Sequence, residues 1–110
     1  MKIKRRDEGD SAIIILDGES ILGDEATDFQ NAVYSALEEN KNKIIIDLEN
    51  VNFISSWGIG ILIHGYTTAI NKQKKYYLAA VSDAVNKSLK ATKLDTIIVQ
   101  YKTVEEALAA

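Results

Sequence analysis

The residues best suited to chemistry form a Ser-Ser-Trp-Gly segment, Ser55 to Gly58, between an apolar run and a helical pattern. A serine at the start of a helix accepts a hydrogen bond from an unpaired backbone N–H, so Ser55 or Ser56 is suited to cap the helix. The free N–H groups and the positive end of the helix dipole also tolerate an anion. A phosphate on a serine here would add roughly −1.5 to −2 charges at neutral pH, enough to repel an acidic partner. The segment therefore predicts a docking point that phosphorylation can switch.

Two glycines and a tryptophan support this interpretation. Gly58 and Gly60 lie within the first turns of the predicted helix, where each glycine costs about 1 kcal/mol relative to alanine. Their presence indicates that some group must approach the backbone closely. Trp57 is a large aromatic residue of the kind that anchors interfaces. A purely structural alternative stays open, in which the serines only cap, the glycines allow tight packing and Trp57 is core. In either case we expect Phe53 and Ile54 to anchor the turn to the core.

An enzymatic function has little support in the sequence. The only histidine, His64, lies eight residues after Ser56, about 12 Å along a helix at 1.5 Å per residue. That separation is too large for a base that activates a serine nucleophile. The chain has no cysteine for a thiolate metal site and no Gly-Lys-Ser/Thr phosphate loop. We therefore expect no catalytic residue, no cofactor and no metal ion.

Composition narrows the class of protein further. The 110 residues suit a single domain spanning residues 1–110, and 46% hydrophobic with 26% charged residues is typical of a globular protein. A formal net charge of −3 disfavours direct nucleic-acid binding, which usually needs a basic surplus. No apolar stretch approaches a membrane span, and none follows the charged amino terminus as in a signal peptide. We therefore expect a cytoplasmic protein with no membrane insertion.

The hydrophobic pattern alternates between strands and helices. Runs rich in β-branched residues predict strands over 2–6, 11–17, 43–48, 76–81 and 96–100, with a hairpin turn at Gly9-Asp10. Helical patterns fall between them, over about 24–40, 56–71, 83–92 and 103–110, and Asp24 is placed to cap the first. Because parallel strands need crossover connections, this order predicts an α/β fold. The expected architecture is a small, mostly parallel sheet of four to five strands with an N-terminal hairpin, covered by helices.

The apolar faces of the two longer helices can be listed from their spacing. For the first helix they are Ala26, Phe29, Val33, Ala36 and Leu37; for the second they are Ile59, Leu62, Ile63, Tyr66, Ala69 and Ile70. In open α/β sheets, ligands and partners gather beyond the carboxyl ends of the strands. Two segments qualify, 17–24 and 51–58.

The central stretch resembles the signature of STAS domains, the anti-sigma factor antagonist family. The buried strand Ile44-Ile45-Ile46-Asp47-Leu48 is followed by Val51-Asn52-Phe53-Ile54-Ser55-Ser56-Trp57-Gly58-Ile59-Gly60-Ile61-Leu62. The family pattern has a strand ending in Asp-Leu, an apolar pair, Asp-Ser, a variable residue and Gly-Leu-Gly. The Gly18-Glu19 loop and the order of elements extend the resemblance over nearly the whole chain.

This resemblance implies a regulatory protein. Unphosphorylated family members bind a serine-kinase anti-sigma factor, phosphorylation of a serine by that kinase ends binding, and a serine phosphatase restores it. By position that serine is Ser56, with Ser55 as an alternative acceptor. The partner-binding residues implied are Ser55, Ser56, Trp57, Gly58, Ile59 and Gly60, with Asp24 from the neighbouring loop.

The chain departs from the family pattern at three places. Ser55 stands where the family has Asp, Trp57 replaces what is often Ser or Ala, and the loop 19–24 lacks the common Glu-Leu-Asp run. An acceptor hydroxyl is retained at Ser56. The resemblance also implies an alternative, because STAS-like domains serve as non-phosphorylated scaffold subunits of transport or stress-signalling complexes.

Overall fold

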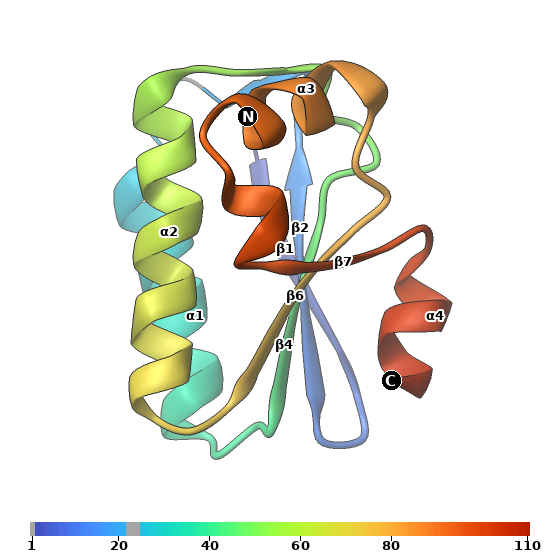
Figure 1. Cartoon of the computed structure of the whole chain (residues 1–110). Coiled ribbons are helices and arrows are strands. Elements are labelled where there is room, and N and C mark those ends of the chain that lie inside the picture. The colour runs from blue at the N-terminus through green and yellow to red at the C-terminus, as the bar shows by residue number, and fades with distance from the viewer. Residues whose placement is uncertain (1, 22–24) are drawn as a thin grey trace.

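The computed structural model describes residues 2–21 and 25–110 of the chain. Its main sheet is built from β1 (Lys2–Glu8), β2 (Ser11–Asp17), β4 (Lys43–Asp47), β6 (Lys75–Ala79) and β7 (Val99–Tyr101). These strands lie in the order β1-β2-β4-β6-β7 (Figure 1). β1 runs antiparallel to β2, and each of the other neighbouring pairs is parallel. The predicted α/β fold with an N-terminal hairpin is confirmed.

The helices alternate with these strands. In the described residues they are α1 (Ala26–Glu38), α2 (Ser56–Asn71), α3 (Asp83–Ala91) and α4 (Val104–Ala109), with a short 3-10 helix η1 (Leu94–Thr96) before β7. Serine and threonine hydroxyls cap three of them: Ser55 caps α2, Ser82 caps α3 and Thr103 caps α4. None of these helices has the length and apolar character needed to cross a bilayer.

Both faces of the sheet are covered. Buried side chains of α1, α2 and α3 pack against one face, where the sheet contributes Ala12, Ile14, Leu16, Ile44, Ile46, Tyr76 and Leu78. On the opposite face α4 packs Val104 and Ala107 against Ile13, Ile45 and Ala79. Figure 1 shows α1 and α2 together on one side of the sheet and α4 on the other. Successive strand residues alternate between the faces, so the isoleucine runs of β2 and β4 supply both cores.

The amino-terminal hairpin closes through a two-residue turn. Glu8 pairs with Ser11, so Gly9 and Asp10 form the loop. Gly9 has φ of +57°, a conformation that most residues avoid and that hairpin turns require. The predicted turn at Gly9-Asp10 is therefore confirmed.

Some boundaries differ from those expected. The last strand begins at Val99 rather than at 96, because Leu94–Thr96 forms η1 and the Thr96 hydroxyl donates to the Lys93 carbonyl at 2.7 Å. The predicted cap of α1, Asp24, lies outside the described residues. α1 begins after Glu25, whose side chain forms no capping hydrogen bond.

The buried face of α2 was predicted only in part. Ile63 and Ile70 are 38% and 44% exposed, so their assignment to the core was wrong. Leu62 and Ala69 are buried as predicted, and the other buried residues of α2 are Gly58, Ile61 and Gly65. α2 is apolar around much of its circumference, so the largest side chains do not mark the inner face. Three small residues, Gly58, Gly65 and Ala69, lie on the inner face and let the helix pack closely.

Candidate functional site

The two loops singled out in the sequence lie side by side. A second, two-stranded parallel sheet pairs β3 (Ser20–Ile21) with β5 (Phe53–Ile54), the strand that leads into α2. The backbone N–H groups of Asn52 and Phe53 both donate to the Glu19 carbonyl, at 2.7 and 3.0 Å. These strands are too short to produce a periodic pattern, so the sequence did not predict them. The loop after β2 therefore supports the turn before α2.

Three polar residues reinforce this connection at the end of β2. Lys4 Nζ lies 2.9 Å from an Asp17 carboxylate oxygen, and Asn50 Nδ2 donates to the other oxygen at 3.2 Å. The hydrogen bond and positive charge of Lys4 hold the pKa of Asp17 below its ordinary value. Asp17 thus links the hairpin to the segment that follows β4.

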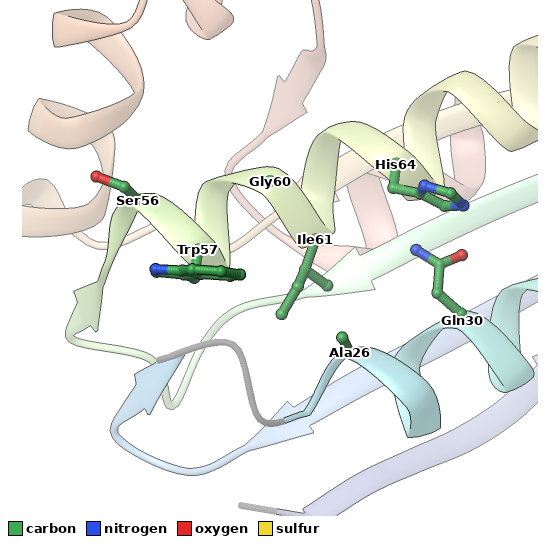
Figure 2. Close-up of a pocket in the computed structure, with 7 residues that line it drawn as sticks. All are labelled: Ala26, Gln30, Ser56, Trp57, Gly60, Ile61 and His64. Atoms are coloured by element: carbon green, nitrogen blue, oxygen red, sulfur yellow. The ribbon is translucent and has the colours of Figure 1, made fainter.

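The two serines have different positions at the start of α2. Ser55 is the N-cap residue, and its Oγ accepts a hydrogen bond from the Gly58 N–H at 3.1 Å. Ser56 is the first helical residue and is exposed. Figure 2 shows its hydroxyl pointing away from the neighbouring Trp57 ring. The first turn of α2 contains no acidic residue, so no carboxylate on that turn offsets the positive end of the helix dipole.

Exposed aromatic side chains adjoin Ser56. Trp57 is 78% exposed, which excludes the structural alternative in which it belongs to the core. Phe53 is 54% exposed, so its expected role as a core anchor was wrong, whereas Ile54 is buried as predicted. Among the described residues, Trp57 and Phe53 are the most exposed large apolar side chains, which makes them candidates for an interaction surface.

The glycines of α2 fall into different environments. Gly58 is buried, and Gly60 is exposed. A Cβ atom on Gly60 would meet nothing within 4 Å, so close approach of another protein group does not explain this glycine. Close approach occurs instead at Gly65, which the sequence did not single out. A Cβ there would lie 2.8 Å from both Phe29 Cε2 and Tyr76 Oη.

A pocket of about 430 Å³ opens between α1 and α2 beside these residues. Its lining comes from both helices: Ala26, Gln30, Ser56, Trp57, Gly60, Ile61 and His64. In Figure 2, Trp57 lies toward one end of the pocket, and the His64 ring and Gln30 amide lie toward the other. The predicted residues Ser56, Trp57 and Gly60 thus meet in one place. Ile59 does not line this pocket and instead packs against the core.

His64 forms its contact with α1 rather than with a serine. Tyr34 Oη and His64 Nε2 are 3.2 Å apart, which places a hydrogen bond across the two helices. Among residues 2–21 and 25–110, no group of three or more acidic or histidine side chains is arranged to hold a metal ion.

Sequence reasoning missed Gln30 and Tyr34 as residues near the site. Both lie on α1 next to its buried stripe, and their spacing from Ala26, at i+4 and i+8, puts all three along one side of the helix. That spacing was a detectable signal. What it could not reveal is that this side faces α2.

Comparison with known proteins agrees with this architecture. Residues 2–107 match the family model of the STAS domain. A curated relative from Thermotoga maritima, provisionally named an anti-sigma factor antagonist, is 25% identical over 100 residues, which cover 90% of this chain and 88% of the relative.

Solved structures share the fold. A crystal structure from Thermotoga maritima, given the same provisional name, matches with a TM-score of 0.87 at 24% identity, over 97% of this chain and 92% of that chain. The Bacillus cell-fate determinant SpoIIAA in its phosphorylated form matches with a TM-score of 0.74 at 17% identity, over 98% and 97% of the two chains. The family resemblance drawn from the strand and the Ser-Ser-Trp-Gly segment is confirmed, and this chain belongs to the STAS domain family.

Proposed function

We propose that this chain is an anti-sigma factor antagonist that acts by binding rather than by catalysis. Its unphosphorylated form binds a serine-kinase anti-sigma factor through the start of α2, and phosphorylation of Ser56 by that kinase ends the interaction. A serine phosphatase restores the binding form. The relatives are named as anti-sigma factor antagonists, which supports an anti-sigma factor as the partner. The geometry of Ser56 supports the phosphorylation switch.

The exposure of Ser56 at the first position of α2 is the observation that carries this proposal. The Ser55 hydroxyl accepts the capping hydrogen bond, whereas no hydrogen bond of the Ser56 hydroxyl occurs among the described residues. A kinase can therefore reach Ser56 without breaking the cap. The product phosphate would lie at a helix start that carries no carboxylate of its own. SpoIIAA, solved in a phosphorylated form, shares this fold.

The exposed Trp57 and Phe53 supply the apolar part of the proposed interface. Interfaces bury roughly 800 Å² on each partner, so a partner that covers Ser56 also reaches both rings. Aromatic residues of this kind carry much of the binding energy at interfaces. A phosphate one residue from Trp57 would bring roughly −1.5 to −2 charges into that contact and weaken it.

The test is a capture experiment with four forms of the chain. Tagged wild type, Ser56→Ala, Ser56→Asp and Ser35→Asp are incubated with extract of the native cell, and bait and captured proteins are identified by mass spectrometry. Ser35 is an exposed serine on α1, so Ser35→Asp adds the same charge away from the site. We expect wild type, Ser56→Ala and Ser35→Asp to capture a serine kinase, and Ser56→Asp to lose it by at least about tenfold.

Phosphate mapping completes the test. The purified kinase with MgATP should transfer phosphate to Ser56 of the wild type and not to Ser56→Ala. The switch is excluded if Ser56→Asp retains every partner and neither Ser55 nor Ser56 carries phosphate. Captured subunits of a transport or stress-signalling complex would then identify the chain as a non-phosphorylated scaffold.

A further inference from the structure

The pocket between α1 and α2 has the size and walls of a small-molecule site. Its volume of about 430 Å³ falls within the range of roughly 300–1,000 Å³ that such sites occupy. The walls are mainly apolar, with Trp57 and Ile61 from α2 and Ala26 from α1. The Trp57 ring offers a flat π surface, which favours stacking or edge contact with another planar ring.

One polar group in the lining has no hydrogen-bond partner in the described part of the chain. Gln30 Oε1 is buried, and no hydrogen-bond donor reaches it among residues 2–21 and 25–110. A buried acceptor without a donor is rare in folded proteins and is unfavourable. The terminal torsion of a glutamine is soft, and its amide presents an acceptor on one side and donors on the other. A small rotation of this amide can therefore offer its oxygen to a molecule in the pocket.

The lining also restricts the charge of an occupant. No carboxylate, ammonium or guanidinium group belongs to the described residues that line the pocket. Away from the start of α2, a charged ligand would lose hydration against apolar walls without meeting a charged side chain among the described lining residues. An uncharged occupant suits these walls.

We infer that this pocket binds a small, uncharged, planar aromatic molecule that carries one N–H or O–H donor. The ring lies against Trp57 and Ile61, and the donor bonds to Gln30 Oε1. This site shares Ser56 and Trp57 with the proposed phosphorylation switch, but it binds a different kind of partner. Its test uses the purified, unphosphorylated chain, so failure of either proposal leaves the other standing.

Two probes of nearly equal shape test the inference. Indole has an N–H donor, and benzofuran has an oxygen in the same place. Binding of each to the ¹⁵N-labelled chain is followed by the NMR signals of the Trp57 indole N–H and the Gln30 side-chain amide. We expect indole to bind with roughly millimolar affinity, as suits a fragment of this size. Benzofuran should bind about fivefold more weakly, the effect of one net hydrogen bond.

Three variants locate the bound molecule. Gly60→Leu should reduce indole binding at least about fivefold, because space for the added side chain exists at the pocket. Thr67→Leu adds a similar side chain at an exposed position of α2 outside the pocket and should leave binding unchanged. Gln30→Met removes the acceptor and should make indole and benzofuran bind equally.

The inference is wrong if indole causes no shift at Trp57 or Gln30 up to several millimolar, or if Gly60→Leu binds indole as the wild type does. Equal affinity of the wild type for indole and benzofuran would also overturn it. Circular dichroism of each variant establishes that it is folded before binding is measured.

Discussion

Ser55 accepts the Gly58 N–H at 3.1 Å, and this bond separates the structural serine of the turn from the exposed serine beside it. The cap satisfies one of the N–H groups that a helix leaves unpaired at its start. Ser56 then remains available for modification. Two adjacent serines thus have different roles, and substituting each of them by alanine should change the free energy of unfolding by different amounts.

Ser55→Ala is expected to lower the free energy of unfolding by about 1 kcal/mol, the usual cost of losing an N-cap hydroxyl. Ser56→Ala should stay within about 0.5 kcal/mol of the wild type, as exposed substitutions do. Urea unfolding followed by circular dichroism measures both. Trp57 fluorescence is a poor probe of folding because this side chain is already exposed in the folded chain. A larger loss for Ser56→Ala would contradict the assignment of the cap.

Gly65→Ala is expected to destabilise the fold by about 1–2 kcal/mol. The added Cβ would lie 2.8 Å from Phe29 Cε2 and from Tyr76 Oη, and this overpacking outweighs the gain in helix propensity. Gly60→Ala is the matched control, because its Cβ would meet open space. It should stabilise the chain by up to about 1 kcal/mol. Thermal and urea unfolding of the two variants should therefore shift in opposite directions, and a shift in the same direction would refute this explanation.

Tyr76 should make stability fall at alkaline pH. Its hydroxyl donates to the Leu62 carbonyl at 3.0 Å, and burial raises the pKa of Tyr76 well above its ordinary value near 10. The unfolded chain releases this proton first, so the stabilisation is complete below about pH 10 and declines as the pH rises further. The free energy of unfolding should be measured between pH 8 and 11.

Tyr76→Phe is the control for this pH dependence. Near neutral pH its free energy of unfolding should be about 1 kcal/mol below that of the wild type, because the variant lacks the hydrogen bond to the Leu62 carbonyl. Above pH 10 its stability should fall less steeply than that of the wild type, since the other tyrosines are common to both. Identical slopes in the two proteins would show that Tyr76 does not cause the decline.

Lys43→Met is expected to weaken the attachment of α4 to the sheet and so to increase local opening of this helix. Lys43 Nζ donates to the carbonyls of Ala107 and Leu108, at 3.0 and 2.8 Å, and also to that of Ala110. Methionine keeps an apolar side chain but removes these bonds, which should cost about 1–3 kcal/mol. Hydrogen exchange should accelerate for the amides of α4 and change little for those of α2. Lys75→Met, at an exposed neighbouring strand position, should leave exchange in α4 unaffected.

The framework of the molecule could be predicted because its local signals agree with one another. The isoleucine runs of β2 and β4 indicate strands buried on both faces, and the structure places them in the sheet with α1 and α2 on one face and α4 on the other. Ser82 and Thr103 cap the helices predicted over about 83–92 and 103–110. In each case the information lies within a few neighbouring residues.

The site was less predictable because it depends on how distant segments face one another. The pocket joins Ala26 and Gln30 on α1 to residues of α2 that lie about 30 positions later. The exposure of Trp57 is also a tertiary property, because a tryptophan in the first turn of a helix fits either a core or a surface. Gly60 was assigned to close approach, whereas the contact occurs at Gly65.

The order of the strands in the sheet has a consequence for synthesis. From β1 to β7 the order in space follows the order in the chain without reversal. Chains emerge from the ribosome amino terminus first. The hairpin of β1 and β2 can therefore form first, and each later strand can add to an edge already in place. No strand has to insert between two that have already paired, so assembly can keep pace with translation.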